Sequence, residues 1–566
     1  MEVKAMTHLG DRIGLVGLAG VFVLAGALAW IGGDSRADES VVDLSDPRIG
    51  NLTAYISAQC YTRTEDDSGR VSNPCFTCHT RGRIPTYLDD HDLQLSYSLP
   101  GDALANPWTN LQVDRSARVA AIGDAAILDY VRTDNYRDAQ GRPILAETLT
   151  RDLPDTWDLD GNGQWDGYVP DAYFDFDEAG FDRTPDGGYS GWRAFGYHPF
   201  PGTFWPTNGS TDDVLIRLPA VFQRNADGRF DLSIYRVNLA IVESLVRRRD
   251  VRLDPVDEIA VGLDLDDDGI LGEATRLVFD WAPLEGRSMS YAGQAGALQS
   301  KGELHLAAGL FPEGTEFLHS VRYIDLDEAG AVRLAARMKE LRYARKNAWY
   351  SYAELKGIND REGAERALDP DILKSVPGDF ERGMFTQGWV YQGFIEDGQG
   401  SLRPQSQEET LFCMGCHGGI GATTDTIFSF PRRLGYETYR HGWFHWSQHG
   451  LAGIPEPRLE DGSYEYSRYL EINGAGDEFR ANTEVMERFF DADGNLLPER
   501  IQALHEDMGT LLLPSAERAL TLDKAYRVIV EEQSFIRGRD ATVEPPLNVH
   551  ESLIQNQATG VEEPSF

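Results

Sequence analysis

Hydrophobic residues are unevenly distributed along the chain, and one apolar stretch stands apart near its start. Residues 13–33 form a run without a charged side chain, preceded by Lys4 and Arg12 and followed by Asp34. A terminal run of this kind predicts an export segment within residues 1–37, either a cleaved signal peptide or a retained membrane anchor. Because basic residues precede the run, we expect the rest of the chain to lie outside the cytoplasm, in the periplasm or at an extracellular face.

The remaining pattern is helical at both ends and β-rich in the middle. Residues 38–150 contain short helical patterns such as 117–133. Residues 151–330 are rich in Gly, Asp and aromatic residues, and their β-type runs lie at 214–218, 230–235, 259–263, 276–281 and 317–324. Residues 331–566 predict further helices, at 332–350, 483–490, 499–508 and 515–533. The expected fold class is α+β, with mainly helical end regions flanking a β- and loop-rich acidic middle region.

The charge balance excludes two classes of partner. The chain has 53 Lys and Arg residues against 91 Asp and Glu residues, a formal net charge of −38 at pH 7. Nucleic acids and anionic membrane surfaces bind Lys and Arg, so we expect no nucleic acid partner and no membrane contact beyond an uncleaved N-terminal segment. A basic protein partner is compatible with this charge. The segment 332–350 is a local exception with six basic residues. The alternatives are a solvated helix face, pairing with acidic loops, contact with the carboxylates of a cofactor and docking of a partner.

Four of the five cysteines lie in two copies of one motif. The pattern C-x-x-C-H occurs at residues 75–79 and 413–417. It is typical of covalent haem attachment, because two thiols form thioethers with the porphyrin edge while the adjacent histidine binds the iron. A disulfide, a thioredoxin-like redox pair and a zinc site are alternatives, and none of them requires a histidine after both pairs. We predict two covalent haem c groups, held by Cys75, Cys78 and His79 and by Cys413, Cys416 and His417.

The two motifs and the export segment together resemble the periplasmic di-haem c-type cytochromes of bacteria. The resemblance covers CFTCH at 75–79, CMGCH at 413–417 and their immediate flanks. It implies electron transfer in a redox reaction or respiratory chain, with a redox protein or another cytochrome as partner. The wide separation of the motifs departs from the spacing of the di-haem peroxidase-like proteins.

The second axial ligand of each iron decides between electron transfer and substrate chemistry, because only an open position binds a substrate. For the second haem the candidates are His441, His445, His449 and Met384. The three histidines would share one face if their segment were helical.

For the first haem the candidate ligands are His91 and Cys60. Cys60 is equally compatible with a redox thiol or with an inert buried thiol. The aromatic segment 191–210, which includes His198, either packs in a core or lines a haem pocket in which His198 acts as an acid or base.

Two acidic loops match the first half of an EF-hand calcium loop. Oxygen-bearing side chains recur at alternate positions, and a glycine stands at position 6 for the sharp turn. The candidate ligands are Asp158, Asp160, Asn162, Gln164 and Asp166 in the first loop and Asp264, Asp266, Asp268, Ile270 and Glu273 in the second. Both loops lack a Glu at position 12, so a bidentate ligand would have to come from elsewhere. We predict structural Ca²⁺, with ordinary Asp- and Gly-rich turns as the alternative.

Two functions are compatible with these features. The first is electron transfer between redox partners by two haems. The second is a di-haem oxidoreductase with one catalytic open-site haem, peroxidase- or oxygenase-like or acting on a small inorganic substrate. A length of 566 residues is more than a simple electron carrier needs, and it gives weight to a substrate site or a platform for a partner.

Overall fold

The computed structural model describes residues 42, 44, 48–65, 69, 71–86, 94–202, 206–473 and 482–561, all within one unit of the chain, Val41–Phe566. No helix in this described part is long and apolar enough to cross a membrane. The predicted export segment 1–37 and the candidate ligand His91 lie outside the described residues.

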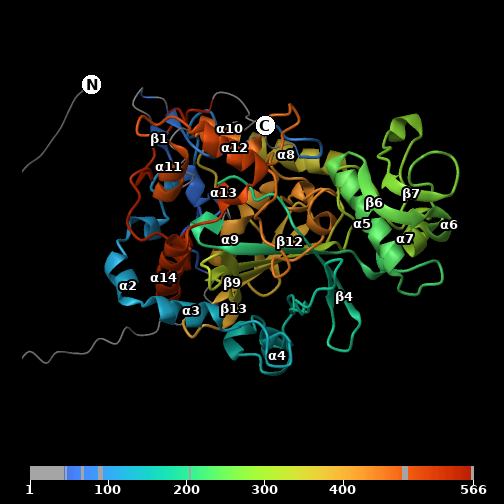
Figure 1. Cartoon of the computed structure of the whole chain (residues 1–566), viewed down its shortest axis with the longest axis horizontal. Coiled ribbons are helices and arrows are strands. Elements are labelled where there is room, and N and C mark those ends of the chain that lie inside the picture. The colour runs from blue at the N-terminus through green and yellow to red at the C-terminus, as the bar shows by residue number, and fades with distance from the viewer. Residues whose placement is uncertain are drawn as a thin grey trace, which may run out of the picture. The chain divides into compact units, whose positions relative to one another are not determined.

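An antiparallel sheet, with nine strands among the described residues, forms the centre of this unit (Figure 1). Its longest strands, β8 (Glu316–Leu326) and β9 (Val332–Lys346), pair with each other in the middle. From β9 the order continues through β12 (Trp389–Glu396), β11 (Gly383–Thr386) and β10 (Gly378–Asp379), with β13 (Leu402–Pro404) also paired to β12. From β8 it continues through β5 (Thr211–Arg217), β4 (Tyr189–Phe195) and β3 (Phe181–Arg183). The two remaining hairpins are β1 (Thr64–Glu65) with β2 (Val71–Ser72), and β6 (Val251–Asp257) with β7 (Glu273–Leu277).

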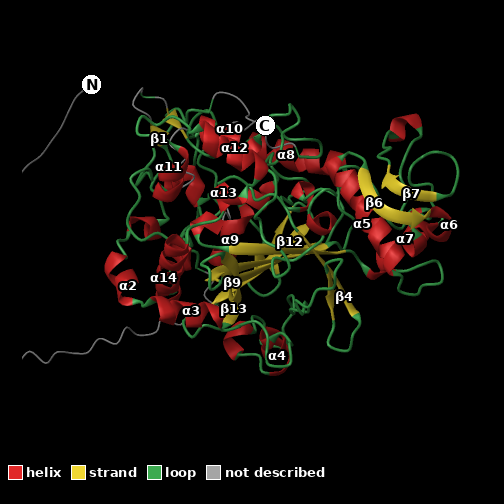
Figure 2. Ribbon diagram, viewed as in Figure 1, coloured by secondary structure: helices red, strands yellow, loops and turns green. Residues whose placement is uncertain are grey.

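Helices surround this sheet, so the predicted α+β fold class is confirmed (Figure 2). In the first half of the chain they are α1 (Cys75–Cys78), α2 (Ser116–Ala121), α3 (Asp124–Arg132), α4 (Ile144–Arg151), α5 (Leu232–Arg247), α6 (Glu258–Val261) and α7 (Gly293–Gln299). In the second half they are α8 (Tyr352–Leu368), α9 (Gln407–Met414), α10 (Glu465–Ile472), α11 (Thr483–Phe489), α12 (Pro498–Glu506), α13 (Gly509–Leu512) and α14 (Ala516–Glu532). Helices α3 and α14 pack on β8, and α9 packs on β11 and β12. Helices α5 to α7 and the hairpin β6–β7 lie together at one side of the sheet (Figure 1).

Several predicted elements match the structure closely. The runs at 214–218 and 317–324 fall in β5 and β8, and the helical patterns at 483–490, 499–508 and 515–533 fall on α11, α12 and α14. The predictions for 230–235 and 259–263 are wrong, because most of the first lies in α5 and the second overlaps α6. Both helices begin after an aspartate whose carboxylate accepts backbone N–H groups, Asp231 and Asp257, and this N-cap outweighs the β propensity of the residues that follow.

The helix predicted at 332–350 is also wrong, because residues 332–346 form strand β9. Strands β8 and β12 flank β9, and it is buried over most of its length, so its sequence lacks the alternation of a half-exposed strand. Its basic residues form ion pairs inside the protein: Arg337 Nη1 lies 2.6 Å from Glu396 Oε1, and Lys346 pairs with Asp425. Of the four alternatives for this basic segment, pairing with acidic residues therefore accounts for Arg337 and Lys346.

The chain around residue 55 crosses directly over the second C-x-x-C-H motif. Helix α9 begins at a capping box, in which the Ser406 hydroxyl accepts the Glu409 N–H and the Glu409 carboxylate accepts the Ser406 N–H. The helix ends at Gly415, and a Cβ atom built there would overlap the backbone carbonyl oxygen of Tyr55. Glycine at this position therefore allows residues 48–65 to pack against the motif.

We expect Gly415→Ala to destabilise the fold by about 1–3 kcal/mol, because the added methyl group forces the Tyr55 backbone away from the motif. Chemical denaturation measures the change. The matched control is Gly363→Ala, since an added Cβ at this exposed position of α8 has no neighbour within 4 Å and should increase stability by up to about 1 kcal/mol. Equal stability of Gly415→Ala and the wild type would contradict this packing.

Candidate functional site

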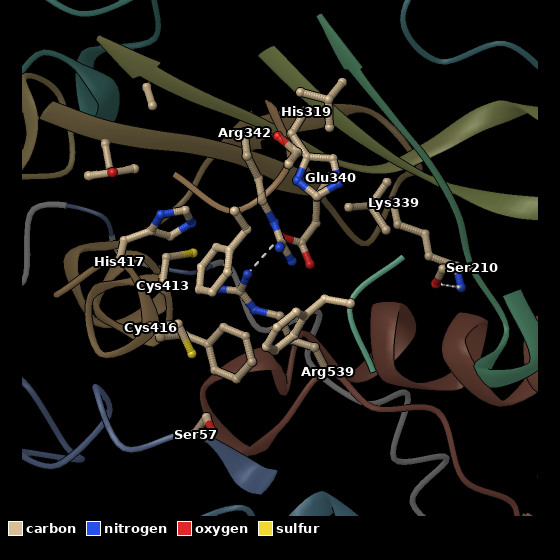
Figure 3. A pocket seen from close by; sticks show the side chains of 18 of the residues that line it. Ser57, Ser210, His319, Lys339, Glu340, Arg342, Cys413, Cys416, His417 and Arg539 are labelled. Atoms are coloured by element: carbon tan, nitrogen blue, oxygen red, sulfur yellow. Dashed lines mark hydrogen bonds and ion pairs between the residues drawn. The ribbon is translucent and has the colours of Figure 1, made fainter. Parts of the chain in front are cut away.

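A cavity between the central sheet and α9 contains the cysteines of the second motif (Figure 3). Cys413 lies in the last turn of α9, while Cys416 and His417 lie in the 3₁₀ turn that follows it. The sheet contributes His319 from β8, Lys339, Glu340 and Arg342 from β9, and Tyr391 from β12. The C-terminal region contributes Tyr526 from α14 and Arg539 and Asp540 after it.

The first motif reaches the same cavity, although it is distant in sequence. Cys78 lines the cavity together with Cys413 and Cys416, and its carbonyl oxygen accepts a hydrogen bond from Ala422 N at 3.3 Å. Burial, followed by the neighbouring Cys78 and Cys60 thiols, raises the pKa of Cys416 well above its usual value. The fold therefore brings the two motifs together.

The cysteine pairs match neither the disulfide nor the zinc-site alternative. All five cysteines are free thiols, so neither pair forms a disulfide in this structure. Among the described residues, the one group of three or more His, Cys, Asp and Glu side chains close enough to hold a metal is Glu258, Asp264 and Asp266. The four motif cysteines therefore do not form a preassembled zinc site.

The His417 ring is neutral and held in one tautomer, with Nε2 available as a ligand atom. Its Nδ1 lies 2.7 Å from the carbonyl oxygen of Thr426, which can only accept a hydrogen bond, so Nδ1 carries the proton and Nε2 keeps its lone pair. Burial lowers the pKa of His417 to about 4, so the ring is neutral at physiological pH. The aromatic rings of Tyr391 and Phe428 lie 4.6 Å and 5.2 Å from it, centroid to centroid.

The wall formed by β9 carries a surplus of positive charge. The buried Glu340 carboxylate pairs with Arg342 Nε at 2.9 Å and with Arg539 Nη1 at 2.7 Å, so one carboxylate serves two guanidinium groups. Burial would raise the pKa of Glu340, but the two arginines outweigh it and lower the value to about 2. Lys339 is also buried, which lowers its pKa to about 8. This wall suits a ligand that bears carboxylate groups.

His319 is a cavity residue that sequence reasoning missed. Its Nε2 lies 2.9 Å from Asp212 Oδ2, and the Tyr197 hydroxyl also hydrogen-bonds to Asp212. The single hint in the sequence is a histidine inside the apolar run 317–324. Tyr197 and Phe200 from the aromatic segment 191–210 line the cavity as well. His198 does not; it is enclosed elsewhere, where burial and then Arg432 lower its pKa to about 3.

The remaining residues of the first motif lie beside this cavity. Cys75 begins α1 and packs against a separate hydrophobic cluster in which Phe76 contacts Tyr469, with ring centroids 5.7 Å apart. His79 ends the helix, and its N–H donates to the Cys75 carbonyl at 2.8 Å. Burial raises the pKa of Cys75, as it does that of Cys60, whose thiol lies 3.7 Å from the Ser57 hydroxyl.

The three histidines at 441–449 do not share a helix face. His441 has a left-handed backbone conformation (φ 56°), stacks on Tyr436 and contacts Asp254. His445 is buried, with Nε2 at 2.8 Å from Asp213 Oδ2. His449 packs beside aromatic rings. None of the three lines the cavity described here, and Met384 is enclosed in the main core.

The two acidic loops share one feature that their sequences do not reveal. In each, a buried glutamate from outside the loop accepts the N–H groups of loop positions 2 and 9. Glu381 accepts from Leu159 and Asp166, both at 3.0 Å. Glu258 accepts from Leu265 at 2.5 Å and Gly272 at 2.8 Å.

The loops differ in their charge. In the first loop Arg382 Nη2 lies 2.7 Å from Asp160 Oδ2 and 2.9 Å from Asp166 Oδ2, so a protein cation neutralises the carboxylates. In the second loop, oxygens of Glu258, Asp264 and Asp266 lie within 4.8 Å of one another. Calcium binding stays a prediction, and its donor set is more complete in the second loop.

Removing calcium should therefore lower stability through the second loop. A site filled at 100 times its Kd contributes about 2.7 kcal/mol, so we expect a chelator to lower the thermal midpoint of the wild type. Asp264→Asn should remove most of this response, whereas Asp160→Asn in the first loop should keep it. A wild-type midpoint that does not change with chelator would contradict the stabilising role.

Comparison with known proteins identifies the family. A family model described as "-like lipoprotein" matches residues 44–507, which include both C-x-x-C-H motifs. An uncharacterized lipoprotein of Aquifex aeolicus (strain VF5) is 30% identical over 614 aligned residues, covering 98% of this chain and 97% of the relative. No solved structure matches the chain.

These matches correct one expectation and support another. Membership of the periplasmic di-haem c-type cytochromes is wrong, because a five-residue motif specifies attachment chemistry and carries no family identity over the rest of a chain. Lipoproteins are exported, so the expected export is confirmed. The chain belongs to this lipoprotein family.

Proposed function

We propose that this protein covalently binds two haem c groups and transfers single electrons outside the cytoplasm. The observation that carries the proposal is the cavity in which Cys78 of one motif meets Cys413, Cys416 and His417 of the other. A haem held there supplies an iron that changes its oxidation state by one electron. Motifs this close together suit electron transfer from one haem to the other.

The residues of the cavity fit a haem at the second motif. Cys413 and Cys416 would form the thioethers, and His417 would bind the iron through Nε2. The planar group would lie among the aromatic side chains of Tyr391, Phe412 and Phe428. Its propionates would pair with the cationic wall at Arg342, Arg539 and Lys339, whose charge Glu340 neutralises only in part.

For the first motif, Cys75 and Cys78 would form the thioethers and His79 would bind the iron. Both cysteines are half-buried, which supports attachment in an environment partly shielded from water. Low solvent access also reduces the reorganisation of water that accompanies electron transfer at each site.

A second function, a di-haem oxidoreductase with one open-site haem, is favoured by the pair His319 and Asp212. Asp212 accepts from the histidine ring and thereby fixes its tautomer and orientation. If a haem is bound in the cavity, a histidine held in this way would be able to act as a ligand to its iron. If it leaves the iron open, it can instead move a proton to or from a substrate.

We further propose that the protein remains attached to the inner membrane through residues 13–33. The run 13–33 carries no charged side chain and is long enough to cross the hydrocarbon core of a membrane. A basic redox protein fits the acidic body of the chain as electron donor or acceptor.

Haem stoichiometry tests the main proposal. Expressed with a haem-attachment system, the wild type should retain two haems per chain after denaturation and organic extraction, measured by intact mass and by absorbance. Cys413→Ser/Cys416→Ser and Cys75→Ser/Cys78→Ser should each retain one. Cys60→Ser is the matched control and should retain both. Wild-type protein without covalent haem, or double variants that keep two, would contradict the proposal.

Low-temperature EPR of the oxidised protein separates the two functions. Two low-spin signals support electron transfer alone, and in that case His319→Ala should convert one of them to high spin if His319 is the ligand. One high-spin signal in the wild type supports the open-site oxidoreductase. An unchanged spectrum in His319→Ala would exclude it as an axial ligand.

A further inference from the structure

A second cavity lies between α5, strand β6 and the segment 433–443, and basic residues dominate its charge. Five cationic or titratable basic side chains line it: Arg193, Arg236, Arg252, Arg433 and His441. Its acidic residues are already engaged. Glu243 and Asp254 are in ion pairs, and Asp257 caps α6.

Arg193 is buried without a carboxylate partner. Its side chain comes from β4, and the residue is 3% exposed. The guanidinium carbon lies 3.7 Å from the ring centroid of Trp443 and 4.4 Å from that of Phe181, and Nε donates to the Ala179 carbonyl at 3.0 Å. Within the described part of the chain no ion pair to Arg193 is formed, although the nearby Asp177 carboxylate acts to raise its pKa. Aromatic rings and one carbonyl group are its principal contacts.

A second buried guanidinium is only partly satisfied. Arg433 also stacks on Trp443, at 4.4 Å from the ring centroid. It pairs with Glu243 at 2.9 Å, but Glu243 also binds Arg247 at 2.6 Å, so one carboxylate again serves two cations. The Arg433 Nε atom is buried and has no acceptor among the described residues.

Like charges are therefore concentrated around two guanidinium groups that are themselves almost fully buried, Arg193 and Arg433. Burial, and then the neighbouring Arg236 and Arg433, lower the pKa of Arg193 well below its usual value. A buried cation without a counter-charge is strongly destabilising, whereas guanidinium groups bind oxyanions with two parallel hydrogen bonds. A bound anion would remove this imbalance.

We propose that this cavity is a binding site for a small oxyanion, of the phosphate or carboxylate type, held by Arg193 and Arg433 and approached past Arg236. The Arg236 side chain is 40% exposed and pairs with Asp254, so it stands where the cavity meets solvent. The site shares no lining residue with the cavity of the two C-x-x-C-H motifs, and it does not depend on haem.

Ligand-dependent stability tests the site in the full-length protein. The thermal midpoint is measured against inorganic phosphate and, in a parallel arm, against acetate, with sodium chloride added to keep the ionic strength constant. A saturable rise with either anion above the chloride baseline is the expected result. Isothermal titration with the same anion gives its affinity.

Three variants locate the binding. Arg193→Met and Arg236→Gln should each weaken the apparent affinity at least tenfold. Arg229→Gln, which changes an exposed arginine that pairs with Asp227 and does not line the cavity, should leave it unchanged. If Arg193→Met does not fold, Arg236→Gln and the two anion arms still decide the matter. A wild type that responds to phosphate and acetate as it does to chloride would overturn the proposal, as would equal affinity in Arg236→Gln and Arg229→Gln.

Discussion

The neutralisation of buried cations on strand β9 is the constraint on which the rest of the structure depends. This strand runs through the middle of the sheet, and its Arg337, Lys339, Arg342 and Lys346 are partly or wholly withdrawn from water. Breaking one such pair by removing a partner costs about 3–5 kcal/mol, because the remaining charge stays buried. The carboxylates that prevent this come from distant segments, Glu396 on β12 and Asp425 after the second motif. Each pair therefore neutralises a buried charge and also holds a neighbouring segment against β9.

The same requirement connects the sheet to the cavity. Glu340 lies in register with Val321 of β8, and His319 lies in register with Arg342, so both strands present polar groups to one side. Arg539, which follows α14, reaches Glu340 and also donates to the carbonyl of Glu409 in α9. Through Arg539, the Glu340 carboxylate thus connects the sheet to the C-terminal region and to the helix that carries Cys413. The position of the motif cysteines is a consequence of this charge network together with the close approach of Tyr55 to Gly415.

The motif residues of this cavity are easier to identify from the sequence than the elements that surround them. The spacing C-x-x-C-H is local, so Cys413, Cys416 and His417 are recognisable without a fold. Strand β9 cannot be recognised from the sequence alone. Its Ala, Arg, Leu, Met and Lys residues favour helices, and a strand buried on both faces lacks the apolar–polar alternation that would indicate a strand. His319 and Glu258 act through partners far from them in sequence, Asp212 and the loop around Asp264, and no local pattern reveals such partners. The α+β class can be predicted because it is determined by many elements together. The role of His319 or of Glu258 is determined by one tertiary contact and cannot be predicted in this way.

The chain is acidic overall, but two of its cavities are lined by cations, and this combination limits how an anionic ligand can bind there. A net charge of −38 repels free anions in solution, an effect that falls off beyond about 10 Å at 0.1 M salt. An anionic ligand must therefore gain its affinity from contacts within a cavity rather than from long-range attraction. The proposed covalent attachment to Cys413 and Cys416 would meet this condition at one cavity, and the proposed pairing with Arg193 and Arg433 would meet it at the other. A cationic partner would be attracted to the same surface that repels anions.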